Sequence, residues 1–469
     1  MRRRGAVLLL SALLAACAAV PPLDREMLRT ERASAVRLEG ANGPLTHAQS
    51  RNVLEELRKR SPETSIFDRH VAVEEKLAGN PLSVGNKATL LQDGKATYAA
   101  MLAAIHGARH HVHIESYIFE GDEVGQEFAR ALAERSKAGV KVRVMYDAVG
   151  SLDTPREFFQ GLREQGIEVV EFNPVTPGTV LTEGLRLNHR DHRKLTIVDG
   201  RVAFLGGINI SSVYAPSSGS GPGSSAPSGG SPRKKAPYAD KPWRDTAVRL
   251  EGPVVADLQR AFVGMWERQK KEKLSDPRLF PKLQAAGPQV VRAIDSSPDD
   301  GPNAAYVALI SAIESAEQSV HLTVAYFVPH PELLASIEEA ARRGVDVRLI
   351  LPSKTDSWLV LHAGHSYYEE LLESGVRIFE RKARLLHSKT AVIDGVWATV
   401  GSTNLDWRSL STNAELNAIV LGPDFAGQLE QAFDADVAQS VEITRSGWAH
   451  RPLSDRLREA MARAWVLML

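Results

Sequence analysis

The chain of 469 residues lacks several features that would place it in a familiar class. It has a single cysteine, so no intramolecular disulfide can form, and it has no cluster of histidines and cysteines typical of a metal site. A glycine-rich phosphate-binding loop is also missing. The formal net charge is zero, whereas dedicated nucleic-acid binders usually carry a clear basic excess. We therefore expect no disulfide, no metal or other cofactor, and no nucleic-acid partner.

Only the N-terminus looks directed to a membrane, and its apolar stretch, Gly5 to Leu14, is too short to span a bilayer as a helix. Three arginines precede this stretch and small residues follow it, which is the pattern of a bacterial secretion signal. We therefore expect residues 1–16 to be a signal peptide. Residues 17–84 are charged and mixed in character, and we expect them to form a tether and N-terminal extension that leads into the first domain.

The segment Leu14-Ala15-Ala16-Cys17 resembles the lipobox of bacterial lipoproteins, in which the cysteine becomes the lipid-modified first residue. Cys17 is the only cysteine, which favours lipidation over a disulfide. By resemblance to lipoprotein sorting signals, alanine at position 18 points to the periplasmic face of the outer membrane. A plain signal peptide with an incidental cysteine is the alternative.

The remaining chain repeats one plan of helices and strands. Both halves show a helix, a strand, a second helix ended by glycine and a second strand, by their apolar spacing. Three landmarks recur at nearly constant separation: Val112 to Val320 is 208 positions, Gly139 to Gly344 is 205, and Gly166 to Gly375 is 209. This internal duplication predicts two α/β domains, each a mixed sheet flanked by helices, that share one active site.

We place the first domain at residues 85–280, the second at 281–446, and a C-terminal helix at 447–469. Residues 211–242 interrupt the plan, because they are rich in serine, glycine and proline and cannot bury enough apolar surface to fold. We interpret them as a flexible insertion, with an active-site lid as the alternative. The apolar residues at the C-terminus, from Trp465 onward, could dock on lipid or pack on the domain.

Each half contains a histidine, a lysine two positions later and an aspartate seven positions later: His192, Lys194 and Asp199, then His387, Lys389 and Asp394. Residues two apart on a strand point to the same face, so each motif presents an imidazole beside an ammonium group. A phosphodiester substrate needs both, one to attack phosphorus and one to stabilise charge on the phosphoryl oxygens. The two aspartates each precede a glycine at a strand end, which favours structural support over direct catalysis.

The match continues beyond the motifs. An asparagine follows each histidine by 17 positions, Asn209 in Gly206-Gly207-Ile208-Asn209 and Asn404 in Gly401-Ser402-Thr403-Asn404, and each amide could donate to a phosphate oxygen. Ser402 has only Gly207 as its counterpart. Asp245 and Glu415 follow their histidines by 53 and 28 positions, a difference close to the length of the insertion. Either acid could orient an imidazole by binding one of its nitrogens.

These residues carry a resemblance to the phospholipase D superfamily, and within it to bacterial cardiolipin synthases. The duplicated motif with its Gly-x-x-Asn tail is specific, and further similar text includes Asn188-His189-Arg190-Asp191 and Leu405-Asp406-Trp407-Arg408-Ser409. The resemblance covers roughly residues 85–445. The chain departs from the common synthase form, which has N-terminal transmembrane helices, and the insertion is unusual.

The resemblance implies a phosphatidyltransferase that makes cardiolipin from two phosphatidylglycerols through a phosphohistidine. We expect His192 to attack phosphorus and His387 to act as acid and then base, with Lys194, Lys389, Asn209 and Asn404 stabilising the phosphoryl group. Asp245 and Glu415 would orient the histidines, with Asp199, Asp394 and Ser402 in support. Phospholipase D hydrolysis to phosphatidic acid, a nuclease and an inactive membrane-surface binding protein remain alternatives. No obligate protein partner is expected.

Overall fold

The structure is a computed structural model that describes Val36 and residues 38–77, 79–176, 188–215, 242–300 and 303–466. The predicted signal peptide, the Cys17 anchor site and residues 216–241 of the insertion lie outside these ranges. Within the described part of the chain, no helix is both long and apolar enough to cross a membrane.

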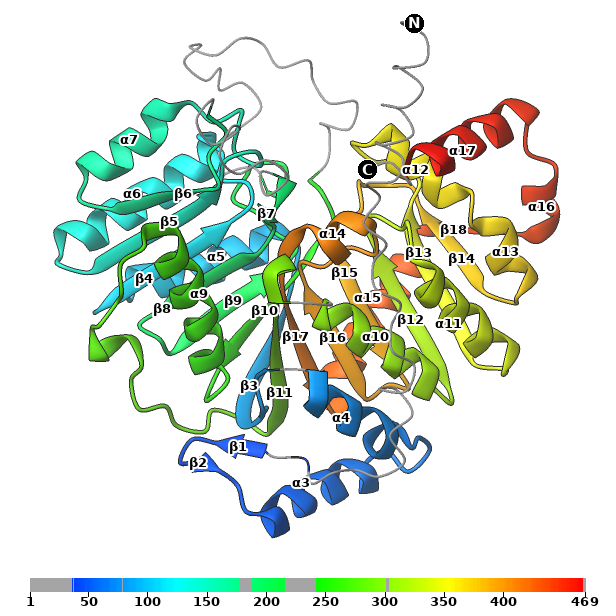
Figure 1. The fold of residues 1–469 in the computed structure, drawn as a ribbon, viewed down its shortest axis with the longest axis horizontal. Coiled ribbons are helices and arrows are strands. Elements are labelled where there is room, and N and C mark those ends of the chain that lie inside the picture. Colours follow the sequence, from blue (N-terminus) through cyan, green and yellow to red (C-terminus); the bar gives the residue numbers. More distant parts are fainter. Residues whose placement is uncertain are drawn as a thin grey trace, which may run out of the picture.

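The first half is built on a mixed sheet flanked by helices (Figure 1). Its described strands follow the order β6 (Glu168–Phe172), β5 (Lys141–Asp147), β4 (His111–Ser116), β8 (Lys194–Val198), β9 (Val202–Gly206), β10 (Thr246–Glu251) and β3 (Leu82–Gln92). Strands β4, β5 and β6 are parallel, and the others pair antiparallel. The helices are α5 (Asp93–His106), α6 (Glu123–Lys137), α7 (Arg156–Glu164) and α9 (Val255–Lys270).

The second half repeats this order strand for strand. It runs β14 (Arg377–Arg381), β13 (Asp346–Pro352), β12 (Ser319–Val324), β15 (Lys389–Ile393), β16 (Trp397–Gly401), β17 (Asn413–Leu421) and β11 (Gln289–Ser296), with β18 (Ser440–Ile443) beside β14. The helices include α10 (Ala304–Ser315), α11 (Pro331–Arg342), α12 (Trp358–His365), α13 (Tyr368–Glu373), α14 (Trp407–Ser411) and α15 (Pro423–Val437). The predicted duplicated α/β architecture is therefore confirmed, and β3 joins the halves by pairing with both β10 and β11.

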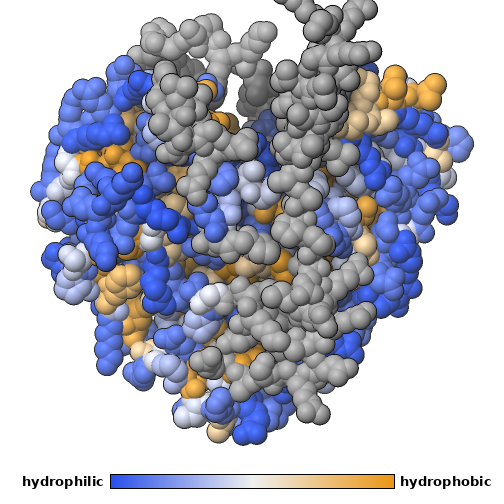
Figure 2. Space-filling view, in the orientation of Figure 1, coloured by the Kyte–Doolittle hydropathy of each residue, from blue (hydrophilic) through white to orange (hydrophobic). Residues whose placement is uncertain are grey.

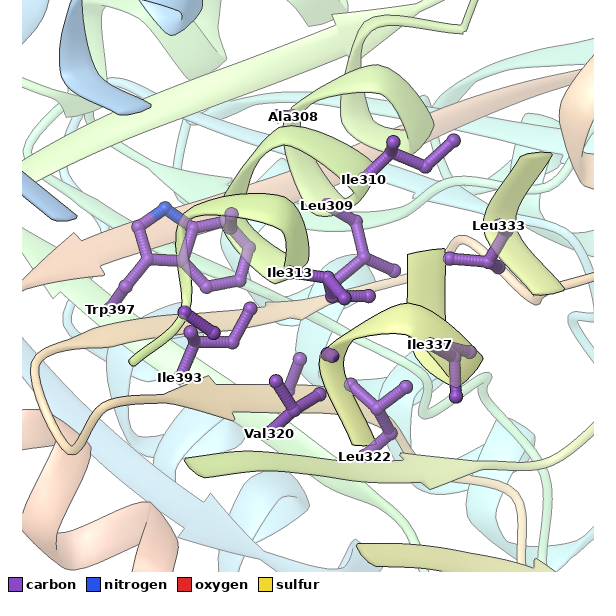
Figure 3. Packing of buried hydrophobic residues seen from close by; sticks show 14 of the residues in the cluster. Ala308, Leu309, Ile310, Ile313, Val320, Leu322, Leu333, Ile337, Ile393 and Trp397 are labelled. Atoms are coloured by element: carbon purple, nitrogen blue, oxygen red, sulfur yellow. The ribbon is translucent and has the colours of Figure 1, made fainter. Parts of the chain in front are cut away.

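Three clusters of buried apolar side chains hold these helices and strands together. In the second half, α10 lays Leu309 and Ile313 on Val320 and Leu322 of β12, and all four are buried (Figure 3). The first half has an equivalent cluster beneath α5, α6 and α7. A third cluster contains residues of α9, α15 and the strands of both halves, so the two domains share a continuous apolar core.

The N-terminal extension packs on the second half and does not simply lead into the first. It comprises β1 (Leu38–Gly40), β2 (Gly43–Pro44), α3 (His47–Lys59) and α4 (Ile66–Leu77), and α4 lies against α10. His70 meets the ring of Trp397 edge-on at 5.6 Å and binds Ser311. Sequence patterning could not assign this docking, because an amphipathic helix does not specify which sheet it covers.

Two other boundaries differ from the sequence-based expectation. The predicted C-terminal helix is two helices, α16 (Arg445–Ala449) and α17 (Leu453–Val466). Residues 211–215, assigned above to the flexible insertion, belong to the folded domain, since Ser211 and Tyr214 are buried. The Tyr98 hydroxyl donates to the carbonyl oxygens of Asn209 and Ser211, at 2.5 and 2.9 Å, and holds this segment in place.

Candidate active site

Backbone pairing between the halves brings the two histidine motifs together. The short strand β7 (Arg190–Asp191) pairs in parallel with the start of β17, and the amide of His192 donates to the carbonyl of Ala414 at 3.0 Å. The other motif repeats this contact, because the amide of His387 donates to the carbonyl of Arg244 at 2.8 Å. Each motif thus enters its own sheet beside the acid-bearing segment of the opposite half.

This pairing exchanges the carboxylates between the halves. Nδ1 of His192, in the first half, lies 3.0 and 3.1 Å from the carboxylate oxygens of Glu415, in the second. Nδ1 of His387 lies 2.7 Å from Oδ2 of Asp245, in the first half. The sequence predicted that these acids orient the imidazoles but left open which acid serves which ring. In both rings the carboxylate engages Nδ1, which leaves Nε2 as the nitrogen for chemistry.

Buried ion pairs also link the two halves of the chain. The Nε atoms of Arg244 and Arg381, one from each half, donate to Asp436 at distances of 3.0 and 2.9 Å. Arg384, in the second half, donates to Asp93, in the first, at 2.7 Å. These ion pairs fix the segment that carries Asp245, so they set the position of the carboxylate against the His387 ring.

Both motif lysines are buried beside their histidines. The ammonium of Lys194 donates to the carbonyl of His192 and lies 5.2 Å from the ring centroid of Tyr117, which packs edge-on against His192. The Lys389 ammonium donates to the carbonyl of His387 and lies 3.0 Å from Nδ1 of that ring. Burial lowers the pKa of Lys194 to about 7 and that of Lys389 to about 8. A bound anion would favour the protonated lysines and raise both values.

Burial dominates the protonation of the other site groups as well. It lowers the pKa of His192 well below its usual value, and the nearby Lys194 and Lys389 charges lower it further. Burial also lowers the pKa of His387, but there the Asp245 carboxylate opposes the shift. The pKa of Glu415 is raised to about 7, again by burial. Both shifts favour the neutral imidazole, and His387, whose shift is opposed by Asp245, is the better placed to hold a proton.

The two asparagines differ in their contacts. Asn209 is engaged at both ends of its amide, since Nδ2 donates to the Tyr214 hydroxyl at 3.0 Å and Oδ1 accepts from the amide of Ile118 at 3.0 Å. The buried amide oxygen of Asn404 has no hydrogen-bond partner among the described residues. The two amides are thus unequal, because Asn209 is engaged at both ends whereas Oδ1 of Asn404 can still accept a hydrogen bond from a ligand.

The aspartate of each motif, Asp199 or Asp394, lies at the far end of the strand from the imidazole. The carboxylate of Asp199 accepts the backbone amides of residues 109–111 at 2.7–3.0 Å, and that of Asp394 accepts the amides of residues 317–319 at 2.8–3.2 Å. Both aspartates have positive φ, 53° and 51°, at the turn after β8 or β15. Their carboxylates tie that turn to the beginning of β4 or β12.

Ser402 and Gly207 occupy equivalent positions and explain the unequal acids. The Ser402 hydroxyl donates to Oε2 of Glu415 at 2.5 Å. At Gly207 a Cβ would lie 2.2 Å from Oδ1 of Asp245, so no side chain fits there. The shorter aspartate packs directly on the glycine backbone, whereas the longer glutamate leaves room for a serine.

The sequence analysis missed Tyr214 at this site. Its buried hydroxyl lies 3.3 Å from Nδ1 of His387 and accepts from Asn209. Tyr214 follows Asn209 by five positions, and Ser409, whose side chain binds Glu415, follows Asn404 by five. Extending the repeat past the asparagines would have revealed this pair, but the serine- and proline-rich composition assigned Tyr214 to a loop.

Comparison with known proteins accounts for this arrangement. The family model described as "Cardiolipin synthase, PLD-like domain" matches residues 101–214 and 309–437, one segment in each half. The chain belongs to this family. A cardiolipin synthase of Alkalihalophilus pseudofirmus is 34% identical over 412 residues, covering 87% of this chain and 77% of the relative. One of Listeria welshimeri is 34% identical over 387 residues, covering 82% and 76%.

Among solved structures, the phosphatidylserine synthase of Haemophilus influenzae Rd KW20 superposes with a TM-score of 0.60 at 12% identity, covering 84% of this chain and 96% of that one. This likeness shows that the two chains share a fold. Within the described ranges of the PLD-like chain, no group of three or more histidine, cysteine or acidic side chains is placed to hold a metal ion.

Proposed function

We propose that this chain is a phospholipase D-type phosphatidyltransferase that forms cardiolipin and glycerol from two phosphatidylglycerols. The observation that carries the proposal is the pair of histidines, each held at Nδ1 by a carboxylate of the opposite half. Curated relatives named cardiolipin synthase that match most of the chain support the choice of reaction.

In the first step, Nε2 of His192 attacks phosphorus of one phosphatidylglycerol and a P–N bond forms. The bond from phosphorus to the glycerol oxygen breaks, and His387 donates a proton to that oxygen, so glycerol leaves. In the second step, the headgroup hydroxyl of another phosphatidylglycerol gives its proton to His387 and attacks phosphorus. The P–N bond breaks and cardiolipin is released, which regenerates both rings.

The unequal surroundings of the rings support these roles. A nucleophile must be neutral, and burial with two nearby ammonium groups disfavours the charged form of His192. An acid must hold a proton before it can donate it. Burial lowers the pKa of His387, but the Asp245 carboxylate 2.7 Å from Nδ1 opposes that shift, and a bound phosphodiester anion would further favour the protonated ring. This arrangement follows the logic by which a carboxylate orients a catalytic imidazole and stabilises its cation.

The remaining polar groups would bind the phosphodiester. Lys194 and Lys389 bring two buried ammonium groups to the same site, where a low dielectric strengthens their attraction for the phosphoryl oxygens. Asn404 Nδ2 would donate to a phosphoryl oxygen, while its Oδ1, which has no partner among the described residues, would accept from a headgroup hydroxyl. Asn209, which is already bonded to Tyr214, would act mainly by keeping that tyrosine beside His387.

The direct test incubates the purified chain with phosphatidylglycerol vesicles and measures cardiolipin and free glycerol. We expect the two products in equal amounts, and no turnover with His192→Ala. Phosphatidic acid without cardiolipin would replace the synthase with a hydrolase that uses water as acceptor. Cleavage of DNA without lipid turnover would favour a nuclease, and the absence of any turnover would leave a membrane-surface binding protein.

The proposal includes a lipid anchor at Cys17, which would hold the enzyme on the periplasmic face of the bacterial outer membrane close to its substrate. Support comes from the lipobox-like Leu14-Ala15-Ala16-Cys17. Metabolic labelling with a fatty acid should mark the wild-type chain, and Cys17→Ser should abolish the label. A chain that remains unlabelled in both forms would exclude the anchor.

A further inference from the structure

Helix α17 is amphipathic, but its apolar side faces away from the protein. Leu453, Leu457, Met461 and Trp465 are spaced four residues apart, so they form one stripe along the helix, hereafter the α17 stripe. Their exposed fractions are 80%, 62%, 52% and 57%. A surface helix normally buries such a face against the core. Here the packing of the domain does not use it.

The side of α17 that packs on the domain is largely polar. Glu459 is 3% exposed and receives a bond from the Arg451 guanidinium at 2.9 Å. Arg463 donates to Glu370 at 3.0 Å and lies 4.6 Å from the ring centroid of Tyr367. Ion pairs, a cation–π contact and the fully buried Ala462 hold the helix to its domain, in an orientation that exposes the stripe.

The stripe lies on the side of the molecule where the active site is found. Strand β13 runs parallel to β12, whose last residue, Val324, pairs with Lys389. The chain that leaves this end of β13 begins α12 at Trp358, which is 53% exposed, and α17 packs on α12. Figure 2 shows an apolar patch at the upper right, over the α12 and α17 region of Figure 1.

The first half exposes apolar side chains at its corresponding sheet edge. Ser116, the last residue of β4, pairs with Lys194, and β5 runs parallel to β4. Leu152, which follows β5, is 77% exposed, and Val175, which follows β6, is 53% exposed. Apolar groups from both halves therefore lie at the edge that holds the catalytic motifs.

Arginine side chains border the α17 stripe. Residues 445–466 contain five arginines and two acids. Three of these arginines form ion pairs with acids of α13, Arg445 with Glu373, Arg451 with Glu369 and Arg463 with Glu370, so the arginines border the stripe without a net charge excess. An apolar helix face flanked by arginines is the pattern of a helix lying in a membrane interface, and the tryptophan suits the headgroup level.

We propose that α17 and Trp358 dock on the surface of a bilayer that contains anionic phospholipid, with the active-site edge toward the lipid. Such docking would let a headgroup reach the buried histidines without leaving the membrane. This inference rests on the proposed function only for the headgroup it places at the site.

The test uses the full chain carrying Cys17→Ser, so that no acyl anchor forms, and vesicles of phosphatidylglycerol and phosphatidylethanolamine. Replacing the four stripe residues by glutamine keeps a good helix former at exposed positions, so folding should persist, as circular dichroism would verify. Phe280→Gln is the matched control, because Phe280 is also exposed (43%) but lies beside the turn at Gly200, at the opposite end of β8 from Lys194.

We expect the stripe variant to partition onto vesicles roughly tenfold or more weakly than the parent, with the control unchanged. Nitroxide-labelled lipids should quench the fluorescence of Trp465, and Trp465→Phe should remove that component. Unchanged partitioning together with an unquenched Trp465 would overturn the inference. So would a stripe variant that only converts a dimer of this chain to a monomer, since the partner would then be a second copy.

A soluble short-chain phosphatidylglycerol separates docking from catalysis. The stripe variant should turn over this monomeric substrate as fast as the parent, while losing activity on vesicles. If the parent transfers no phosphatidyl group in either form, the proposed function fails, and the partition and quenching results still decide the docking. If the stripe variant also loses short-chain turnover, its effect lies in the site and the docking inference is wrong.

Discussion

The carboxylate beside His192 belongs to Glu415, which also accepts a hydrogen bond from the Ser402 hydroxyl. The carboxylate beside His387 belongs to Asp245, which packs on the backbone of Gly207. The Glu415 pair is longer, at 3.0 and 3.1 Å against 2.7 Å, and burial raises the pKa of Glu415 to about 7. The duplicated motif has thus acquired two different settings: the surroundings of both rings lower the imidazole pKa, but at His387 the Asp245 carboxylate opposes that shift.

The largest effect should come from removing the imidazoles, and the leaving group should tell them apart. His192→Ala should abolish turnover of every substrate. His387→Ala should lower phosphatidylglycerol turnover by about 10²–10⁴-fold, but much less with p-nitrophenol as leaving group, because p-nitrophenolate departs without a proton. Product release by each variant on both substrates is the measurement. Equal losses on both substrates for His387→Ala would contradict its role as acid.

The next-largest loss of activity should come from replacing the two carboxylates by amides. Asp245→Asn should lower kcat by about 10²–10³-fold and by no more than His387→Ala does, because this carboxylate acts through the His387 ring. Glu415→Gln should cost less at pH 6, where much of Glu415 is already protonated since its pKa is about 7, and more at pH 8. Steady-state kinetics at the two pH values decide this. A larger loss for Glu415→Gln than for Asp245→Asn would reverse the assignment of the rings.

The glycine–serine difference can be tested by making the halves alike. Gly207→Ala would place a methyl 2.2 Å from Asp245 Oδ1 and displace that carboxylate, so we expect a roughly 10²-fold loss of kcat. Ser402→Ala removes one hydrogen bond to Glu415 and should cost about tenfold. Thermal unfolding of both variants is the control for stability. Equal activity of Gly207→Ala and wild type would show that Asp245 needs no such packing.

The protonation of the two lysines should determine how kcat/KM falls at alkaline pH. In our proposal the phosphodiester binds to protonated ammonium groups, and burial lowers the pKa of Lys194 to about 7 and that of Lys389 to about 8 in the free enzyme. Because kcat/KM reports the free enzyme, it should fall as the pH rises through these values, and kcat should fall only at higher pH. A rate profile from pH 5 to pH 10 measures both. A rising kcat/KM between pH 7 and pH 9 would contradict binding by protonated lysines.

The smallest effect concerns the pair missed in the sequence. Tyr214→Phe removes the hydroxyl that lies 3.3 Å from His387 Nδ1, and we expect a loss of about 2–10-fold in kcat with little change in KM. Ser409→Ala, its counterpart near Glu415, should have a similar effect at pH 8 and a weaker one at pH 6. The kcat and KM of each variant are compared at both pH values. An effect of Tyr214→Phe on KM alone would indicate that it binds substrate.

Repeated spacing was enough to predict two α/β halves, because strands and helices of a duplicated domain repeat their apolar periods. The same counting could not show the exchange of carboxylates, since it measures distance within a half, whereas β7 pairs with β17 of the other half. Composition also misassigned Tyr214, because serine and proline around it say nothing of the Tyr98 contact that fixes the backbone there. The docking of α4 on α10 likewise depends on tertiary shape.

The binding of each imidazole by a carboxylate of the opposite half has a consequence for biosynthesis. A first half that folds before the second has been made contains His192 but lacks the glutamate that orients it, and the second half alone has His387 without its aspartate. Nucleophilic competence therefore arises at the final docking of the halves, and a truncated or partly made chain carries no complete catalytic dyad. Because both halves must be present before either histidine–carboxylate pair can form, an incomplete chain should not attack membrane lipid.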